Sequence, residues 1–398
     1  MSAGVSFASP VPGVRLAQLP PLALYVHIPW CVKKCPYCDF NSHQAKENVP
    51  EKAYVQALVS DLEQALPQVW GRRVASVFFG GGTPSLFSAE AIETLISAFR
   101  ARLTLTADCE VTLEANPGTF ESEKFRAYRD AGVTRLSIGI QSFDPKHLRA
   151  LGRIHDDREA RRAIEIAREH FDTVNLDLMY ALPGQTLEEA VADADAAIGA
   201  GVDHLSFYHL TIEPNTHFYR HPPALPDEDA SAGMQDAIGA ALARVGYVHY
   251  ETSAWARPGR ECRHNLNYWR FGDYLGIGAG AHSKLSFSDR VTRSARWKQP
   301  KEYLERVAEG RPLQESHEVG REDLVFEFMM NALRLTGGFP SGLLAERTGL
   351  QIALAEKPLR EAEARGLIVR SHERIAPSAL GQRFLNDLLQ LFLPVKPS

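Results

Sequence analysis

The chain has 398 residues and a formal net charge of −5, with 44% hydrophobic and 23% charged residues. This composition is typical of a globular protein with room for one large and one smaller domain, and it excludes a disordered chain, a transmembrane protein and general nucleic-acid binding. Five cysteines in so long a chain argue against a disulfide framework, and the proline-interrupted N-terminus is not a signal peptide, so we expect a cytoplasmic protein.

Residues 1–21 are expected to form a flexible lead-in to an α/β domain over residues 22–255. Short β-branched or aromatic runs alternate there with stretches of helical period, which is typical of a parallel sheet with crossover helices. Six strands are predicted at Leu22–Ile28, Val74–Phe79, Glu110–Leu113, Arg135–Ile140, Thr173–Tyr180 and His204–Leu210. Helices are predicted at 51–66, from Ser88, and at 121–131, 156–170, 187–200 and 230–245. Six such units fall short of the eight of a closed barrel, so we expect an open, partial (β/α)6 TIM-like barrel.

The remaining chain divides into two parts. Residues 256–320 read as a loop-rich extension that carries the sequence HNLNYW. Residues 321–398 predict a mostly helical, winged-helix-like C-terminal domain, with short helices at Leu343–Thr348 and Leu359–Arg365 and a last helix at Pro377–Leu391. A winged helix can bind DNA, but no basic cluster is concentrated here, so a packing or lid role is favoured.

Three of the five cysteines, Cys31, Cys35 and Cys38, follow the first predicted strand within eight residues. A loop this short closes around a metal centre at little entropic cost. Two kinds of centre fit: a mononuclear zinc site completed by His27 or His43, or a cubane iron–sulfur cluster whose fourth iron stays open for a small molecule. The distant Cys109 and Cys262 have no partner motif and are expected to be ordinary small apolar residues.

Polar motifs also follow the other predicted strands. Gly80–Gly82 comes after the second strand and lacks the Lys-Ser/Thr of a nucleotide P-loop, but it permits close backbone approach to a ligand. Glu114 ends the third strand, Gln141 follows the fourth and Asp177 lies in the fifth. Because the carboxyl ends of parallel strands meet at one rim of a barrel, these motifs predict a single site next to the cysteine loop.

The spacing Cys-x3-Cys-x2-Cys, with an aromatic residue before the last cysteine, resembles the signature of the radical S-adenosylmethionine (SAM) superfamily. Seven stretches resemble the oxygen-independent coproporphyrinogen III oxidase (HemN) family in particular: 25–31, 35–38, 80–85, 114–117, 139–143, 177–184 and 276–279. This resemblance runs from about Leu22 to the C-terminus. It implies an open radical SAM barrel in which Cys31, Cys35 and Cys38 hold a [4Fe-4S] cluster and SAM chelates the open iron.

The same resemblance implies two sets of SAM contacts. Tyr25, Gly81 and Glu114 match positions that contact the SAM bound to the cluster. Positions associated with a second SAM in the oxidase match Tyr37, Gly82, Thr83, Gln141, Arg153 and Asp177. Mixed polar partners of this kind suit a ligand with a carboxylate, an amine and two ribose hydroxyls.

Two features favour the haem-chaperone branch of this family. The oxidase motif continues to a further cysteine two residues after the third, where this chain has Phe40. The sequence His264-Asn265-x-x-Tyr268-Trp269 matches a hallmark of the chaperone branch. The resemblance then implies haem as cargo, delivery to haem-requiring proteins such as respiratory enzymes at the membrane surface, and no oxidase activity. A homodimer is compatible with it.

The haem contacts themselves stay open at this stage. His264 can ligate haem iron, and Tyr268 and Trp269 can cover a porphyrin face. The alternative is that His264 and Trp269 fasten the loop to the barrel, with Cys262 and His282 as other conceivable axial ligands. A true oxidase that decarboxylates coproporphyrinogen III and a radical SAM methyltransferase are the alternative functions, and whether SAM is cleaved is not predicted.

Overall fold

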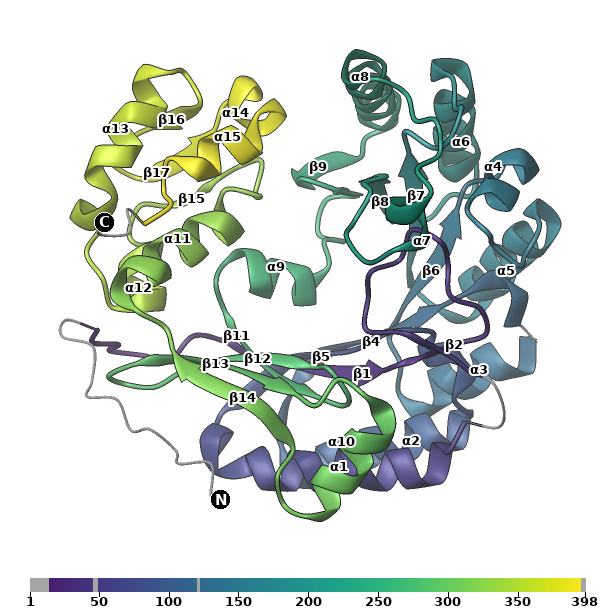
Figure 1. The fold of residues 1–398 in the computed structure, drawn as a ribbon, viewed down its shortest axis with the longest axis horizontal. Coiled ribbons are helices and arrows are strands. Elements are labelled where there is room, and N and C mark those ends of the chain that lie inside the picture. Colours follow the sequence, from purple (N-terminus) through teal and green to yellow (C-terminus); the bar gives the residue numbers. More distant parts are fainter. Residues whose placement is uncertain (1–13, 46–48, 120–121, 395–398) are drawn as a thin grey trace.

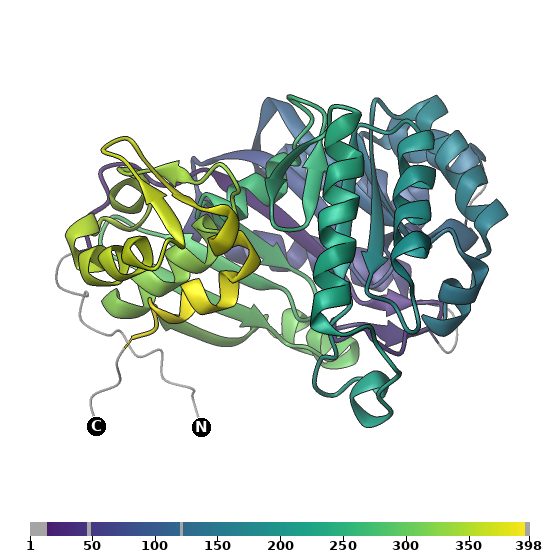
Figure 2. The same ribbon diagram turned by 90° about the horizontal axis from the view of Figure 1, so that it is seen from above.

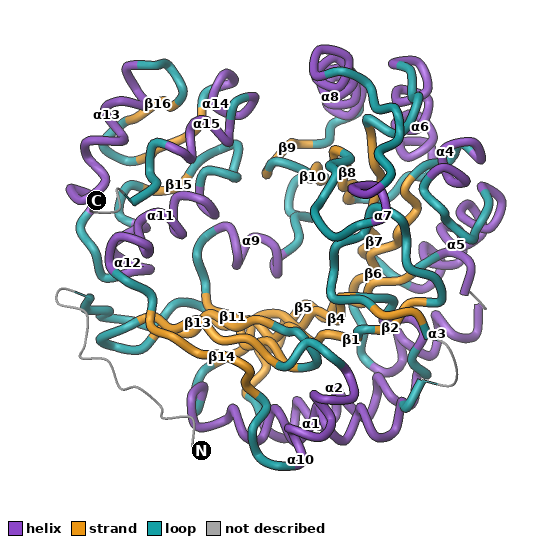
Figure 3. Tube along the Cα trace, in the orientation of Figure 1, coloured by secondary structure: helices purple, strands orange, loops and turns teal. Residues whose placement is uncertain are grey.

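The computed structural model describes residues 14–45, 49–119 and 122–394. Its main feature is a curved twelve-stranded sheet (Figures 1 and 3). Six central strands run parallel: β1 (Leu22–Ile28), β4 (Arg73–Gly81), β5 (Thr104–Ala115), β6 (Arg135–Gln141), β7 (Thr173–Tyr180) and β8 (His204–His209). They are neighbours in this order, as expected when each crossover returns to the adjacent position.

Helices cover the convex face of these strands (Figure 1). They are α1 (Glu51–Val69), α2 (Ala89–Arg102), α3 (Ser122–Ala131), α5 (Asp157–His170), α6 (Leu187–Gly199) and α8 (Glu228–Arg244). Ser88 caps α2 as predicted, and Asp156 and Thr186 begin α5 and α6 with capping boxes. The sheet does not close on itself, so the predicted open (β/α)6 barrel is confirmed. Within the described part of the chain, no helix combines the length and apolarity needed to cross a membrane.

The part of the chain that follows β8 extends the sheet at both edges. On one edge lie β10 (Ala254–Ala256) and β9 (Val248–Glu251), which pair antiparallel. On the other edge β11 (Asp273–Ile277) pairs parallel with β1 and is followed by antiparallel strands β12 (His282–Ser286), β13 (Val291–Arg296) and β14 (Leu313–Glu318). The helices of this part are α9 (Arg263–Trp269) and α10 (Pro300–Ala308). The prediction of a loop-rich stretch at 256–320 was therefore wrong, because β11 pairs with the distant β1 and the next three strands each pair with the one before.

The C-terminal residues form a separate hydrophobic core around Phe328, Leu344 and Leu359. Its elements are α11 (Arg321–Ala332), β15 (Phe339–Pro340), α12 (Leu343–Thr348), α13 (Glu356–Ala364), β16 (Ile368–Arg370), β17 (Arg374–Pro377), α14 (Ala379–Arg383) and α15 (Leu385–Gln390). The predicted last helix is wrong in one respect, since it breaks at Phe384 into α14 and α15. Seen from above, this mostly helical part lies beside the open side of the barrel (Figure 2).

A buried ion pair ties the added strands to the barrel. Asp61 on α1 and Arg296 on β13 are almost fully buried and lie 3.2 Å apart. Asp61 also accepts hydrogen bonds from the Tyr303 hydroxyl at 2.8 Å and from the Gly278 backbone N–H at 3.2 Å. The effect of such a buried charge pair on stability is clearest when one partner is removed, because the other charge is then buried without compensation.

We expect Asp61→Asn to lower the free energy of unfolding by about 3–5 kcal/mol, because it leaves the Arg296 guanidinium buried without its counter-charge. Denaturant unfolding measures this change. The matched control is Glu63→Gln on the same helix, which removes a half-exposed pair with Arg102 and should change stability by less than about 1 kcal/mol. Equal effects of the two substitutions would contradict a structural role for the buried pair.

Candidate functional site

The cysteine loop is held between two short strands at the carboxyl end of β1. These strands, β2 (Trp30–Cys31) and β3 (His43–Gln44), pair in parallel. The Lys34 ammonium donates to the carbonyl oxygens of Phe40 and Ser42 at 3.2 and 3.1 Å and so closes the loop from inside. All three cysteines of the loop line one cavity of about 460 Å³.

The donor set fits a cluster better than a single zinc ion. Two sulfurs bound to one tetrahedral zinc lie about 3.8 Å apart, given a Zn–S distance of about 2.3 Å. Among the described residues, the only set of three histidine, cysteine or carboxylate ligand atoms that all lie within 4.8 Å of one another is at Asp144, His147 and Glu189, not at the cysteines. Neither His27 nor His43 lines the cavity. Three half-buried thiols that line one cavity offer three of the four thiolate ligands that a [4Fe-4S] cluster takes.

Burial is the main influence on these thiols. It raises the pKa of Cys31 and of Cys38, while hydrogen bonds from Thr83 and Ser42 partly oppose the shift at Cys31. A metal centre that displaces the thiol protons therefore gains ligands that are otherwise protonated near neutral pH.

The structure brings eight of the nine predicted SAM residues into the same cavity as the cysteines. They are Tyr37, Gly81, Gly82, Thr83, Glu114, Gln141, Arg153 and Asp177. The ninth, Tyr25, does not line the cavity, and its hydroxyl lies 3.0 Å from His27 Nδ1. Motifs spread over five strands thus meet at one rim, as the parallel barrel predicts, whereas the role of each residue stays a prediction.

Two of the glycines at the end of β4 are required by the chain's own packing. Gly81 has φ +115°, and a Cβ there would lie 2.5 Å from the His27 ring. A Cβ at Gly82 would lie 2.5 Å from the Trp30 carbonyl oxygen. The Gly81 N–H donates to Glu114 Oε2 at 3.1 Å and so joins the ends of β4 and β5. Two of the three glycines therefore keep the cysteine strand and the rim in contact.

Glu114 is the most perturbed acid of the rim. Burial, then the nearby Asp177, raises the pKa of Glu114 to about 8, against the opposing hydrogen bond from Gly81. Burial also raises the pKa of Asp177, whose carboxylate accepts from Ser137 and Asn175 at 2.7 and 2.8 Å. Two buried acids with few counter-charges favour a cationic ligand group.

Arg153 connects the rim to the cysteine loop. Its guanidinium donates to Asn116 Oδ1 at 2.6 Å, to the Gly139 carbonyl at 2.7 Å and to Cys35 Sγ at 3.6 Å. Asn116 in turn donates to Thr83 Oγ1 at 2.8 Å. A positive charge next to Cys35 compensates the negative charge of a thiolate ligand.

Part of the cavity lining was not predicted. It includes Met179, Tyr208, His209, Thr211 and Glu213, mostly from the end of β8 and the loop after it. The signal was available, because Tyr208 and His209 lie at the end of the sixth predicted strand and Thr211 and Glu213 follow it, as the other motifs end or follow theirs. Gln141 has a left-handed backbone conformation with φ +70°, beside a bulge in β6. Such strained backbone clusters at functional sites.

The HNLNYW helix α9 lies inside the barrel and not at its mouth (Figure 1). His264 is 1% exposed, its ring stacks on Phe78 with centroids 4.9 Å apart, and Nδ1 lies 2.9 Å from the Ser76 hydroxyl. Burial lowers the pKa of His264 to about 3. The guanidinium of Arg334 lies 4.3 Å from the centre of the Trp269 ring. This geometry matches fastening of the segment to the barrel, and direct haem contact by His264 stays a prediction that requires α9 to move.

A chain of buried hydrogen bonds runs from the cavity to α9. Asn175 donates to Asp177, and its amide oxygen lies 2.6 Å from His204 Nδ1. His204 Nε2 lies 2.8 Å from the Tyr250 hydroxyl, which accepts from the backbone N–H of Cys262 at 3.4 Å. Cys262 directly precedes α9, and its buried thiol donates to Glu110 at 3.6 Å. The sulfur is therefore engaged inside the protein.

Comparison with known proteins agrees with this site. A model of the radical SAM superfamily matches residues 25–197, and a model of the HemN C-terminal domain matches residues 319–384. A protein of Escherichia coli named Heme chaperone HemW is 48% identical over 380 residues, which cover 95% of this chain and all of the relative. A Haemophilus influenzae protein of the same name is 46% identical over 95% of this chain and 99% of its own length.

The chain belongs to the HemW family. Among solved structures, coproporphyrinogen III oxidase (HemN) of Escherichia coli has a TM-score of 0.80 over 97% of this chain and 96% of its own, at 23% identity. That likeness establishes the fold of both the barrel and the C-terminal part. Membership of the radical SAM superfamily implies SAM and a [4Fe-4S] cluster, and the three cysteines and the polar rim of this HemW-family chain suit both.

Glu114 should make stability depend on pH. Because its pKa is higher in the folded than in the unfolded protein, the stability it contributes is complete below about pH 4.5 and is lost as the pH rises toward 8. The difference in unfolding free energy between wild type and Glu114→Gln should therefore fall by up to about 1.4 kcal/mol per pH unit across this window. Parallel stability curves for the two proteins would contradict the raised pKa.

Proposed function

We propose that this protein is a haem chaperone, which binds haem and delivers it to haem-requiring proteins. The observation that carries the proposal is the 48% identity to a chain named Heme chaperone HemW over the full length of that relative. Phe40, in place of the further cysteine of the oxidase motif, supports the same branch. We further propose that delivery takes place on the cytoplasmic side, in accord with five free cysteines.

In this proposal Cys31, Cys35 and Cys38 hold the [4Fe-4S] cluster, and Arg153 offsets the thiolate charge at Cys35. The cluster, when bound, supplies an open iron position for the amine and carboxylate of SAM. Glu114 and Asp177 provide the negative charge that receives a cationic group, and Gly81 orients Glu114 through its N–H. Tyr25 is buried close enough to Glu114 for that carboxylate, after burial itself, to raise the pKa of the Tyr25 hydroxyl, and we assign it a supporting contact with the SAM site.

The haem proposal is tested by anaerobic reconstitution of cluster and haem with the full chain. We expect about four irons per chain before haem is added, one haem bound per chain, and transfer of that haem to a haem-free acceptor protein. Coproporphyrinogen III supplied with SAM and a reductant should not be decarboxylated. Absence of haem binding, or formation of the vinyl product, would overturn the proposal.

The cluster ligands are tested separately. A Cys31→Ala, Cys35→Ala and Cys38→Ala triple variant should lose the cluster absorbance, whereas Cys109→Ala should keep it because that half-buried thiol lies outside the cavity. Zinc in place of iron after reconstitution of the wild type would restore the zinc alternative.

Glu114 should couple SAM binding to proton release. Near pH 7 its carboxyl is largely protonated, since its pKa is about 8, and a cationic ligand group stabilises the charged form. Calorimetric titration of SAM in buffers of different ionisation enthalpy should therefore show proton release for the reconstituted wild type and none for Glu114→Gln. Equal proton release by both proteins would place the coupled group elsewhere.

A further inference from the structure

The carboxylate of Asp177, which lines the cysteine cavity, receives hydrogen bonds from residues inside the barrel. Its two oxygens accept from Ser137 Oγ at 2.7 Å and from Asn175 Nδ2 at 2.8 Å. Behind Asn175, the Nδ1 atom of His204 and the hydroxyl of Ser206 lie 2.6 and 3.1 Å from the amide oxygen. Asn175, His204 and Ser206 do not line the cavity. They can therefore act on a ligand in it only through Asp177.

The direction of every hydrogen bond in this chain follows from the carboxylate. Ionised Asp177 can only accept, so Asn175 turns its NH2 group toward Asp177 and its amide oxygen toward His204. His204 therefore carries its proton on Nδ1. Its Nε2 lies 2.8 Å from the Tyr250 hydroxyl and accepts from it. All donors in the chain thus point toward Asp177 and stabilise its charged form.

Both ring nitrogens of His204 are hydrogen-bonded inside the protein, although the side chain is fully buried. His147 and His264 are buried to a similar extent, and each has one ring nitrogen without a hydrogen-bond partner among the described residues. Burial, then the nearby Arg135, lowers the pKa of His204 well below its usual value. The ring therefore stays neutral, with the single proton that the chain requires.

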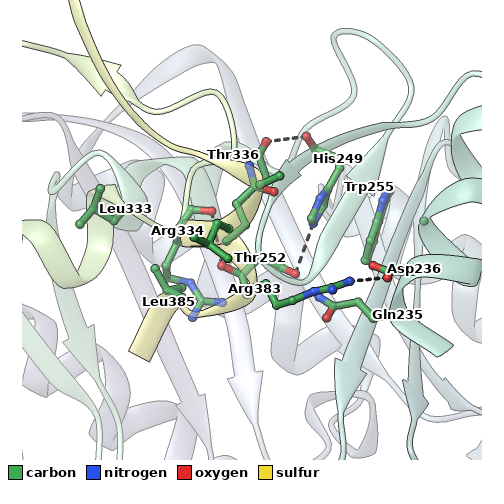
Figure 4. A pocket seen from close by; sticks show the side chains of 14 residues that line it. Gln235, Asp236, His249, Thr252, Trp255, Leu333, Arg334, Thr336, Arg383 and Leu385 are labelled. Atoms are coloured by element: carbon green, nitrogen blue, oxygen red, sulfur yellow. Dashed lines mark hydrogen bonds and ion pairs between the residues drawn. The ribbon is translucent and has the colours of Figure 1, made fainter. Parts of the chain in front are cut away.

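The far end of the chain is fixed by the C-terminal part. Tyr250 lies on β9, and its carbonyl oxygen accepts from the Thr336 backbone N–H at 3.2 Å. The Thr336 hydroxyl donates to the carbonyl oxygen of the preceding residue, His249, at 2.6 Å (Figure 4). These contacts hold the strand that carries the first donor of the chain.

The chain opposes the effect of burial on Asp177. Burial raises the pKa of this carboxyl, whereas its hydrogen bonds and then the charge of Arg135 on β6 lower it. Glu114 on β5 and Tyr208 on β8 also face it, and a charge on Glu114 disfavours a charge on Asp177. Loss of a hydrogen bond would therefore leave more of the carboxyl protonated. A protonated carboxyl offers no charge to a cationic ligand group.

We propose that His204 is a positioning residue for the cavity ligand: through Asn175 it holds the Asp177 carboxylate ionised and oriented toward a cationic group of SAM. The inference rests on the proposed SAM site and adds to it a residue that lies outside the cavity. His204 touches no ligand itself, because Asn175 lies between it and Asp177.

Two substitutions separate the two ring nitrogens of His204. In His204→Asn the amide nitrogen takes the place of Nδ1 and can still donate to Asn175. In His204→Gln the amide group takes the place of Nε2, so the contact with Tyr250 remains and the donor to Asn175 is lost. Each variant buries one amide in place of the ring, so a merely structural role would make them equivalent.

The measurement is SAM binding to the reconstituted full-length protein from about pH 5 to about pH 9. Wild type should bind SAM less tightly as the pH falls through the pKa of Asp177. His204→Gln raises that pKa, so the loss should move about one unit to higher pH, with about 10-fold weaker binding on the acid side and an unchanged alkaline end. His204→Asn should follow the wild-type profile. Glu114, whose pKa is about 8, adds a step that all three proteins share.

The outcomes separate this inference from the function on which it rests. If wild type binds no SAM, the proposed SAM site fails and the inference fails with it. If wild type binds SAM but both variants have the same profile, or the wild-type affinity does not fall toward acid pH, His204 has no positioning role while the SAM site stands. Should neither variant fold, Ser206→Ala removes the other donor to the Asn175 oxygen. It should move the acid loss in the same direction, and an unchanged profile overturns the inference.

Discussion

The parallel pairing of β1 with β11 is the constraint on which the rest of the molecule depends. Leu22–Val26 aligns with Asp273–Ile277 on one side and with β4 on the other, so the first strand lies inside the sheet. Asp273 secures the pair, since its buried carboxylate meets Arg72 and Lys284 at 2.8 Å each. The cysteine loop leaves β1 at its carboxyl end, while α9 enters β11 at its amino end. One pairing therefore places the cluster loop at the rim and the HNLNYW helix in the interior.

The barrel interior is consequently filled by polar groups and aromatic rings, and not by an aliphatic plug. Buried polar groups are tolerated when they are hydrogen-bonded, and the chain from Asp177 through Asn175 and His204 to Tyr250 meets that condition. Arg135 is 2% exposed, and its Nε and Nη1 have no hydrogen-bond partner among the described residues. Its charge faces Cys262, Glu110, Tyr250 and Asp177. Arg135 therefore interacts both with Asp177 at the rim and with Cys262 directly before α9.

The limits of sequence reasoning follow from how local each feature is. The bounds of β1 and β7 were predicted correctly, because continuous apolar runs in buried parallel strands need no distant information. The strands β11–β14 were missed, since they are short and are held in the sheet by β11 pairing with the distant β1 and by each later strand pairing with the one before. The strand-end motifs predicted the rim of the site, because the carboxyl ends of the parallel strands of a barrel all meet at one rim. The burial of His264 could not be predicted, because nothing in HNLNYW indicates that Ser76 and Phe78 enclose this side chain.

The burial of α9 bears on the role of its HNLNYW motif. His264 contacts β4. The centre of the Tyr268 ring lies 5.1 Å from that of His264 and 4.4 Å from that of Tyr274. The Trp269 ring lies against the guanidinium of Arg334. These contacts reach three different neighbours: β4, which leads to the glycine rim, β11, which pairs with β1, and Arg334, which follows α11. They fasten the motif between the barrel and the C-terminal part, because His264 packs on β4 and Trp269 on Arg334, while direct haem contact by the motif stays a prediction.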